Sequence, residues 1–496
     1  MKKILVMLLT TILLLLSVGC ENVEYKTESS QPESSVDIFE SLESKLPDFV
    51  PSVSEDDSST EGEESESTSS SYIGAYTIVT DDATAFYQDE STPGTISSAI
   101  EGRNSFLRQK YGVDVDVKQA TTKEIMNGLR QAEKSGIEYC DLISISGSET
   151  VSLYLSGLLC DMNTLPDFDP KSEFFDAKNA TALATNSTLY MIADPTAYVY
   201  DKAYVLFYNR ELLENTSAPN PDELVLQGKW TWDAFNTCVK QAAAEVYNKT
   251  SANLETDIYG FSAYYLDYGY SLAMWYSSGN KIIGDTYKNK VALSTSSNGV
   301  TTIAQKALKY YNVKGRYPFE GEDARSAFEN GRLAFLSNRL DYLYSLRDGT
   351  LSGQKYGFLP MPKFSEEQES YACLLDSSAR VLAMPKSVES RSEDQKRLAG
   401  LLLSALCASG RSTIQEAYIS SNLALYLYDN TETVILKTIT DSIVFDFANV
   451  FGTKIAKVAN ASSKAVNDYY VLGSALPTMI NRNISQFQYY SKTNFK

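Results

Sequence analysis

The stretch of sequence that decides the fold runs from Tyr139 to Met162 and reads YCDLISISGSETVSLYLSGLLCDM. It opens with an apolar run, Cys140–Ile145, which has the length and composition of a buried strand. The small polar residues Ser146-Gly147-Ser148 follow, and the residues after them are predicted to form a helix. A buried strand that passes through a short polar loop into a helix is the repeating unit of open parallel sheets.

The same alternation of strand and helix precedes this stretch. Strands are predicted at Tyr76–Thr80 and Val113–Val117, and a helix at Thr95–Tyr111. A capping box begins a further helix over Thr121–Lys134. The order predicts an α/β fold with an open, mostly parallel sheet, on which ligands bind at the carboxyl ends of strands. Those ends are Asp81-Asp82 and Ser146–Glu149.

A second series of elements follows. Strands are predicted at Val205–Asn209, Ile258–Ala263, Ala334–Ser337, Tyr356–Leu359 and Val381–Met384. Helices are predicted at Trp232–Tyr247, Ser297–Tyr311, Asp323–Asn330 and Ser392–Ala408, and the tail from Thr431 is predicted to be mostly helical. The roughly 425 residues from Tyr72 onward are too many for one ordinary hydrophobic core, so we expect two or more lobes.

The N-terminus has the pattern of a secretory leader. Lys2 and Lys3 precede an apolar run from Ile4 to Val18 that would span only about 22 Å as a helix, short of the ~30 Å hydrocarbon core. The run ends in LSVGC, which resembles a bacterial lipobox and implies cleavage of residues 1–19 and lipidation of Cys20. The alternative is an ordinary signal peptide followed by an incidental cysteine.

The segment after the leader is strongly acidic. Residues 21–71 contain 15 Asp and Glu side chains against two lysines, with a run of serines at 65–71 that only Glu66 and Thr68 interrupt. Low hydrophobicity with high net charge predicts disorder, so residues 20–71 are interpreted as a lipid anchor and a disordered acidic tether. A short amphipathic turn over Ile38–Leu46 is the alternative within it.

Composition excludes several classes of function. The chain contains no histidine, which removes His-based catalytic triads, His-ligated zinc and His general bases. Its net charge of −19 argues against binding to nucleic acid, which requires a basic face. No cofactor or metal site is predicted. The 34 tyrosines suit carbohydrate or aromatic ligands as well as ordinary cores.

Five cysteines follow Cys20, and none forms a CxxC pair. We expect them to act as small buried apolar side chains, with a disulfide between Cys140 and Cys160 as the alternative. The cysteines are Cys140, Cys160, Cys238, Cys373 and Cys407.

The order of motifs resembles the extracellular solute-binding proteins of ATP-binding-cassette importers, in the large sugar-binding group that includes the maltose-binding proteins. The resemblance covers about residues 76–425 and depends on the order and spacing of several short motifs. These are KYGVDVDV (Lys110–Val117), the opening stretch Tyr139–Met162, LFYNREL (Leu206–Leu212) with TWDAF (Thr231–Phe235), AFENGRLAFLSN (Ala327–Asn338), YGFLPMPK (Tyr356–Lys363) and RVLAMPKS (Arg380–Ser387).

The resemblance implies a periplasmic-binding-protein-like fold of type II, in which two discontinuous α/β lobes are joined by a hinge and the ligand binds in the cleft between them. Residues 72–203 and 380–430 would form lobe one, and residues 204–379 and 431–496 would form lobe two. Closure of such a fold is a hinge motion driven by a ligand that contacts both lobes.

The resemblance also indicates polar ligand-binding residues. Ser148 and Glu149 occupy the positions where relatives supply a polar pair to sugar hydroxyls, with a helix N-cap as the alternative. Asp82 lies just past the first strand, where the alternative is a solvated turn. Asp341 falls on the position where some relatives place a tryptophan platform, so Arg339 and Asp341 could bind polar groups of the ligand, or instead pair with each other at the surface.

Aromatic residues complete the candidate site. Trp275 precedes a segment where relatives place cleft residues, and Tyr268 and Tyr270 lie just upstream. A sugar packs its C–H groups on an exposed aromatic ring, whereas the alternative is a core aromatic residue on an amphipathic helix. Trp230 and Trp232 are interpreted as structural. Lys202 stands where maltose-binding relatives carry an acid, so the sequence departs from that pattern.

These observations predict a binding protein and not an enzyme. It would be held by its lipid on the extracellular face of the bacterial cytoplasmic membrane, as a monomer, and would deliver a carbohydrate, in particular an oligosaccharide, to permease subunits. One alternative is the same fold with a peptide, a polyamine or an acidic saccharide as ligand. The others are a sensor that does not transport and a surface glycosidase that uses two carboxylates.

Overall fold

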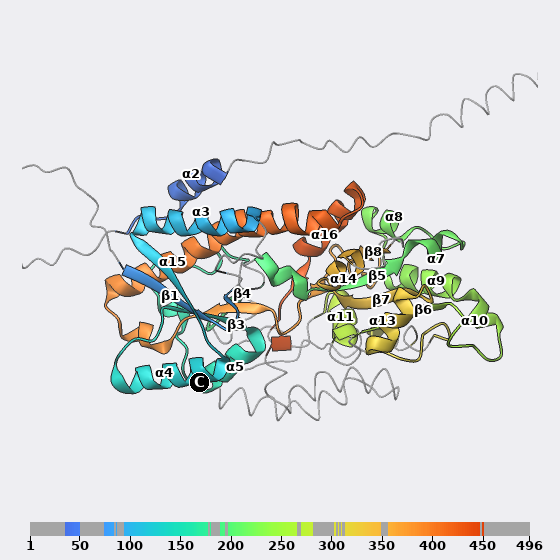
Figure 1. The fold of residues 1–496 in the computed structure, drawn as a ribbon, viewed down its shortest axis with the longest axis horizontal. Helices are drawn as coiled ribbons and strands as arrows, with labels where there is room; N and C mark the ends of the chain where they lie inside the picture. The colour runs from blue at the N-terminus through green and yellow to red at the C-terminus, as the bar shows by residue number, and fades with distance from the viewer. Residues whose placement is uncertain are drawn as a thin grey trace, which may run out of the picture.

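The computed structural model (Figure 1) describes residues 35–49, 74–83, 86, 94–176, 179, 189–193, 197–264, 269–280, 302–303, 306, 309, 313–348, 356–446 and 449–450. Its helices and strands form two lobes, each built around its own sheet. The predicted helix Ser297–Tyr311 and the tail beyond 450 lie mostly or wholly outside the described residues.

The first lobe contains a five-stranded sheet in the order β2-β1-β3-β10-β4. Strands β1, β2 and β3 are parallel, as predicted, whereas β10 runs antiparallel to both β3 and β4. The bounds are β1 Gly74–Thr80, β2 Val113–Gln119, β3 Leu142–Ser146, β4 Ile192–Ala193 and β10 Arg380–Ala383. Every residue of β3 except the last is buried, which explains its unbroken apolar sequence.

Helices cover both faces of this sheet: α3 and α15 lie on one side and α4 and α5 on the other (Figure 1). The predicted capping box forms at Thr121 with Glu124, and a second one forms at Ser392 with Gln395. The helices are α3 Gly94–Tyr111, α4 Thr122–Ser135, α5 Gly147–Leu155 and α15 Glu393–Ser409. Shorter 3₁₀ and π segments are η2 Met162–Thr164, η3 Ala197–Lys202, η5 Lys386–Ser390, η6 Gly410–Gln415, η7 Tyr418–Asn422 and η8 Leu423–Tyr426.

The second lobe contains a mixed sheet in the order β6-β7-β5-β8. Strands β6 and β7 are parallel, and β5 runs antiparallel to its neighbours β7 and β8. The strands are β5 Tyr204–Asn209, β6 Tyr259–Ala263, β7 Leu333–Arg339 and β8 Tyr356–Leu359. The helices around it are α7 Arg210–Glu214, α8 Pro221–Leu226, α9 Trp232–Ala242, α10 Ala244–Asn248, α11 Ser271–Ser277, α13 Gly321–Glu329, α14 Tyr342–Asp348 and α16 Asn430–Asp441.

Two tryptophans are structural in this lobe, as predicted. Trp230 and Trp232 are fully buried. The indole N–H of Trp230 donates to the carbonyl oxygen of Pro360 at 3.0 Å, and that of Trp232 donates to Ser277 Oγ at 3.1 Å. Because each polar atom has a partner, the large rings are buried without the cost of an unpaired donor.

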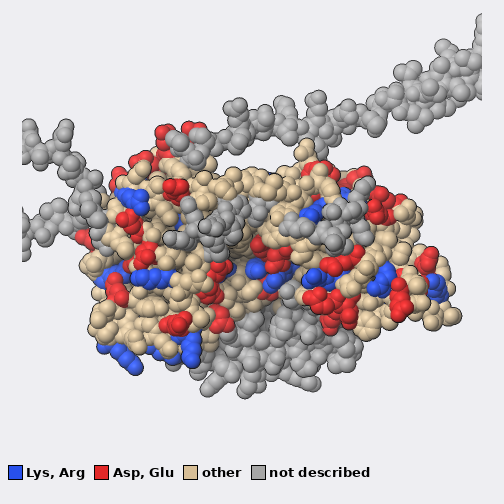
Figure 2. All heavy atoms as spheres, viewed as in Figure 1, with Lys and Arg blue, Asp and Glu red and all other residues tan. Residues whose placement is uncertain are grey.

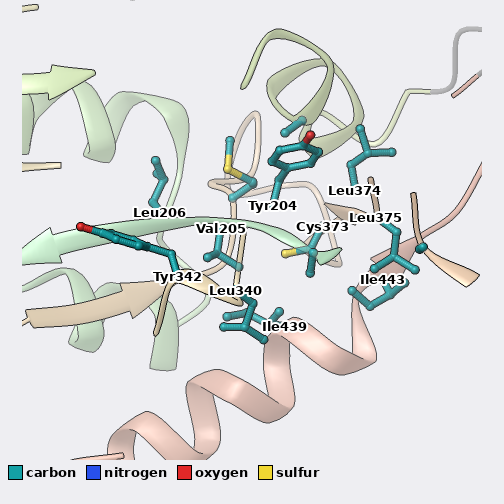
Figure 3. Packing of buried hydrophobic residues seen from close by; sticks show 14 of the residues in the cluster. Tyr204, Val205, Leu206, Leu340, Tyr342, Cys373, Leu374, Leu375, Ile439 and Ile443 are labelled. Carbon is teal, nitrogen blue, oxygen red and sulfur yellow. The ribbon is translucent and has the colours of Figure 1, made fainter. Parts of the chain in front are cut away.

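The lobes meet over a buried apolar junction, where strand β9 (Cys373–Leu374) pairs with β11 (Ile443–Val444). Figure 3 shows the start of β5 packed there against β9 and against the last turn of α16. Residues from distant parts of the chain, such as Tyr204, Leu375 and Ile439, are all buried at this place. The junction is therefore a shared core rather than a linker.

Three sequence-based expectations need correction. The predicted helix Trp232–Tyr247 divides at Ala243 into α9 and α10. The five cysteines that follow the leader are buried thiols, so the predicted burial is confirmed and the alternative Cys140–Cys160 disulfide is absent. Disorder does not extend over all of residues 20–71, because Ser35–Lys45 form helix α2, in agreement with the alternative of a short amphipathic turn over Ile38–Leu46. Leu42 on that helix and Leu46, which directly follows it, are buried and pack on the first lobe.

No helix among the described residues has both the length and the apolar character needed to cross a membrane.

A buried charge cluster attaches α16 to the second lobe. Glu432 is fully buried and accepts hydrogen bonds from Arg210 at 2.8 Å and from Arg347 at 3.1 Å. Arg210 also pairs with the buried Asp222. These contacts place one carboxylate between guanidinium groups from two other elements, so α16 is held by charge as well as by apolar packing.

We predict that Glu432→Gln lowers the free energy of unfolding by about 3 kcal/mol, because it leaves a buried guanidinium charge without its counterion. Urea unfolding measures this change. The control is Asp441→Asn, which removes an exposed partner of Lys437 and should change stability by less than about 0.5 kcal/mol. Equal changes in the free energy of unfolding for the two substitutions would contradict the conclusion that Glu432 helps to hold α16 on the second lobe.

Candidate functional site

The segment Asp376–Arg380 links the two lobes and organises the candidate site. At one end, the hydroxyl of Tyr204 donates to Asp376 Oδ2 at 2.5 Å, and the Asp376 N–H donates to the carbonyl oxygen of Lys202 at 2.8 Å. At the other end, Arg380 begins β10 opposite Ser146, the last residue of β3. The segment thus connects the start of the second sheet to the carboxyl ends of strands in the first.

Arg380 joins the ends of two strands in the first sheet. Its guanidinium donates to Thr80 Oγ1 and to the carbonyl oxygen of Ser144, each at 2.9 Å. The same group lies 2.8 Å from Asp81 Oδ1 and 3.4 Å from Asp82 Oδ2. The predicted site residue Asp82 is therefore part of an ion-paired group at the end of β1, and not only a solvated turn.

The predicted loop after β3 lies against the linking segment. The N–H groups of Gly147 and Ser148 donate to the carbonyl oxygens of Ala379 at 2.9 Å and Ser377 at 3.0 Å. Ser146 is the N-cap of α5, since its hydroxyl accepts from the N–H of Glu149 at 3.3 Å. The alternative in which Ser148 caps the helix is therefore wrong, and the half-buried Ser148 side chain lies within the first turn of α5.

The second lobe contributes a compact charged group at the end of β7. Asp341 Oδ2 accepts from Arg339 at 3.0 Å and from Lys202 at 3.2 Å. All three side chains are partly exposed. The predicted pairing of Arg339 with Asp341 occurs, and Lys202 joins it from the 3₁₀ segment that precedes β5. Figure 2 shows acidic and basic side chains side by side near the middle of this face of the molecule.

The predicted aromatic residues behave differently. Trp275 and Tyr270 are 3% and 2% exposed. The ring of Tyr270 packs on Phe261, with 4.6 Å between centroids. This matches the alternative of core aromatics, and in this structure neither residue offers an exposed face to a sugar. Tyr268 and the lipidation candidate Cys20 lie outside the described residues.

The structure brings most of the predicted polar residues into one neighbourhood. Ser148 bonds to the linking segment, Asp82 is paired with Arg380 at the end of that segment, and Asp341 is paired with Lys202, whose carbonyl bonds to Asp376. Sequence reasoning missed Arg380, Asp376 and Tyr204. Arg380 was visible as a charge at the start of a predicted buried strand, where a charge needs a partner. Nothing in the sequence marked Asp376 or Tyr204.

A buried carboxyl group lies beside this site. Asp201 is 7% exposed and accepts hydrogen bonds from the hydroxyls of Tyr344, at 2.9 Å, and Tyr418. Burial is the main cause that raises the pKa of Asp201 to about 7, and the hydrogen bond from Tyr344 works in the opposite direction. Since Tyr344 is on α14 and Tyr418 is on η7, the carboxyl group connects the two lobes through tyrosines.

The chemistry of these groups is that of recognition by hydrogen bonds. Carboxylates, guanidinium groups, an ammonium group and hydroxyls lie at the edges of both sheets and can exchange partners with a polar solute. Across the described part of the chain, no group of three or more Cys, Asp or Glu side chains is placed to hold a metal ion.

Comparison with known families assigns the class of protein. Residues 103–404 match the family described as bacterial extracellular solute-binding protein, and this chain belongs to that family. No curated protein sequence matches the chain significantly.

Solved structures share its two-lobed, type II fold at low sequence identity. A family 1 extracellular solute-binding protein from Bifidobacterium longum subsp. infantis matches with a TM-score of 0.55 and 13% identity, over 84% of this chain and 99% of that one. The cyclic α-maltosyl-1,6-maltose binding protein from Arthrobacter globiformis gives 0.54 and 13%, over 84% and 99%. The maltose-binding protein MalE from Listeria monocytogenes, in complex with maltose, gives 0.51 and 14%, over 83% and 98%.

We predict that stability depends on pH through Asp201. Its folded-state pKa of about 7 exceeds its ordinary value of 3.8, so between these pH values the folded state binds more protons than the unfolded state. The stabilisation is complete below about pH 4 and is lost as the pH rises through 7, by about 2–4 kcal/mol in all.

The test compares urea unfolding of the unmodified chain with that of Asp201→Asn from pH 5 to pH 8. The difference in unfolding free energy between the two chains should move in favour of the variant as the pH rises, because Asn carries no charge to desolvate. Parallel pH profiles would show that Asp201 does not titrate in this range.

Proposed function

We propose that this protein captures a carbohydrate, most simply an oligosaccharide, between its two lobes and delivers it unchanged to the permease of an ATP-binding-cassette importer. The observation that carries the proposal is the polar group around the linking segment Asp376–Arg380, to which both lobes contribute. A solute that bonds to Ser148 and Asp82 on one side and to Arg339 and Asp341 on the other would hold the lobes together.

The charge balance of this group favours a neutral polyhydroxyl ligand. Its acids Asp81, Asp82, Asp341 and Asp376 nearly balance its bases Lys202, Arg339 and Arg380, and most of these groups are paired with one another. A strongly anionic or cationic solute would have to displace one partner and leave the other charge uncompensated. Hydroxyls can donate to the carboxylates and accept from the bases without breaking that balance.

Two further assignments belong to the proposal. The lobes would divide at the predicted boundaries, with residues 72–203 and 380–430 in one and residues 204–379 and 431–496 in the other. The order of the sheets and the packing of α16 on α8 and β8 support this division. The protein would act as a monomer without enzymatic activity, so a bound saccharide should be recovered intact.

A thermal-shift screen of the chain from Glu21 onward, against mono- and oligosaccharides with peptides and polyamines as controls, identifies the ligand. A saccharide at 100 times its dissociation constant should add about 2.7 kcal/mol to the free energy of unfolding. Arg339→Ala should reduce that gain, whereas Lys437→Ala, on an exposed face of α16, should leave it unchanged. A response confined to peptides or polyamines would contradict the proposal that the ligand is a carbohydrate. Recovery of a cleaved saccharide would contradict the proposal that the protein binds its ligand without enzymatic activity.

The lipid anchor at Cys20 is tested separately. Cys20→Ser should move the protein from the detergent phase to the aqueous phase in a Triton X-114 partition, because the thioether-linked acyl chains that anchor it are lost. Cys238→Ser, which removes a buried thiol from the folded part, should stay in the detergent phase. Retention of the Cys20→Ser chain in the detergent phase would contradict the anchor.

A further inference from the structure

Helix α2 is too short to be stable alone. It has 11 residues, from Ser35 to Lys45, and isolated helices of this length are marginal in water. Its existence therefore depends on packing against the rest of the molecule. Figure 1 shows α2 on the outer side of α3, away from the sheet of the first lobe.

The contact of α2 with the first lobe is specific. Leu42 and Leu46 are 6% and 3% exposed and belong to the apolar core of that lobe. The ring of Phe39 stacks on Phe106 with 5.3 Å between centroids, directly above Gly102, where a Cβ atom would lie 2.9 Å from the ring. A glycine at this position of α3 thus lets the phenyl ring approach the helix backbone.

Polar contacts fix the end of α2. The side chain of Lys110, only 4% exposed, lies 2.7 Å from Asp48 Oδ1 and donates to the carbonyl oxygen of Glu43 at 3.1 Å. The hydroxyl of Tyr111 donates to the carbonyl oxygen of Pro47 at 3.0 Å. Lys110 and Tyr111, at the end of α3, thus donate to two backbone carbonyl oxygens and to one carboxylate of the segment 43–48. These contacts give that segment one defined position.

The other side of α2 faces the π-helical segment η6–η7, Gly410–Asn422, which contacts the junction between the lobes. Within it, Gln415 accepts from the hydroxyl of Tyr200 at 3.1 Å, and Tyr418 donates to Asp201. The Tyr418 hydroxyl also lies 2.7 Å from that of Tyr344 in the second lobe. π-Helical turns are less regular than α-helices and occur often at functional positions.

A groove of about 820 Å³ lies between α2, α3 and this π-helical segment. Its walls are Ile38, Phe39 and Leu42 of α2, small residues such as Ser98 and Ala99 of α3, and Thr413, Glu416 and Ala417. The groove thus lies where α2, α3 and the π-helical segment meet, so residues of all three elements line one common space.

We propose that the outer face of α3 and the π-helical segment Gly410–Asn422 form a docking surface for the chain's own segment 35–49, and that this docking couples the N-terminal tether to the junction between the lobes. Segment 35–49 would then connect the N-terminal part of the chain to residues 410–422, whose Gln415 and Tyr418 hydrogen-bond to Tyr200 and Asp201 at the junction between the lobes.

Hydrogen–deuterium exchange of the chain from Glu21 onward tests this proposal, with Leu42→Asp as the variant and Ser44→Asp as the matched control. Both add one carboxylate to α2, but Leu42 is buried and Ser44 is exposed. Leu42→Asp should speed exchange about fivefold or more at residues 35–49 and also at 410–422, because a charge cannot stay in that apolar contact. Ser44→Asp should change neither region.

Deletion of residues 35–49 should give the same faster exchange at 410–422. Rapid exchange of residues 35–49 in the unmodified chain would overturn the docking. Faster exchange at 35–49 in Leu42→Asp without a change at 410–422 would overturn the coupling. The inference extends the proposed anchor at Cys20, but the measurement needs neither lipid nor ligand, so either proposal can fail without the other.

Discussion

The position of residues 376–380 is the constraint on which the rest of this structure depends. This short segment is the start of β10 in one sheet and the neighbour of β5 in the other, so its backbone must satisfy hydrogen bonds from both lobes at once. The partly buried charge of Arg380, whose side chain is 17% exposed, adds a second requirement, since a guanidinium largely removed from water needs several acceptors. Thr80, Ser144 and the two aspartates supply them only when the ends of β1 and β3 lie side by side.

A site built from mutually paired charges has a consequence for ligand recognition. Lys202, Arg339 and Arg380 each already pair with an aspartate of the site, so a solute that bonds to these groups must exchange with existing ion pairs. The net gain per hydrogen bond is then modest, about 0.5–1.5 kcal/mol, and affinity must come from many such exchanges made by both lobes together. Under the proposed function, these conditions favour an extended polyhydroxyl ligand over a small ion, because the former can bond to both lobes at once.

Much of the fold was predictable because local signals and tertiary packing agree in it. The apolar run of β3, the capping box at Thr121, the helix that begins after Ser392 and the two buried tryptophans are all found where the sequence predicted them. The misses have physical reasons. Helix α2 was expected only as a short amphipathic turn, because its apolar residues lie within an acidic, serine-rich segment whose average composition favours disorder. The sequence around Trp275 is the same whether the ring lies in a cleft or in the core, since only tertiary packing decides which face of a helix is buried. Arg380 belongs to the site through partners far away in sequence, which no local pattern reveals.

The buried thiols have a consequence for how such a chain matures outside a cell. Burial raises the pKa of Cys160 and of Cys238 to about 12, so in the folded protein these sulfurs remain protonated and react slowly with oxidants. In the unfolded chain the same thiols are exposed and have ordinary acidity, so a disulfide absent from the native structure can form there. Protection from oxidation therefore comes with the folded state, and a substitution that slows folding would lengthen the time in which these thiols can react.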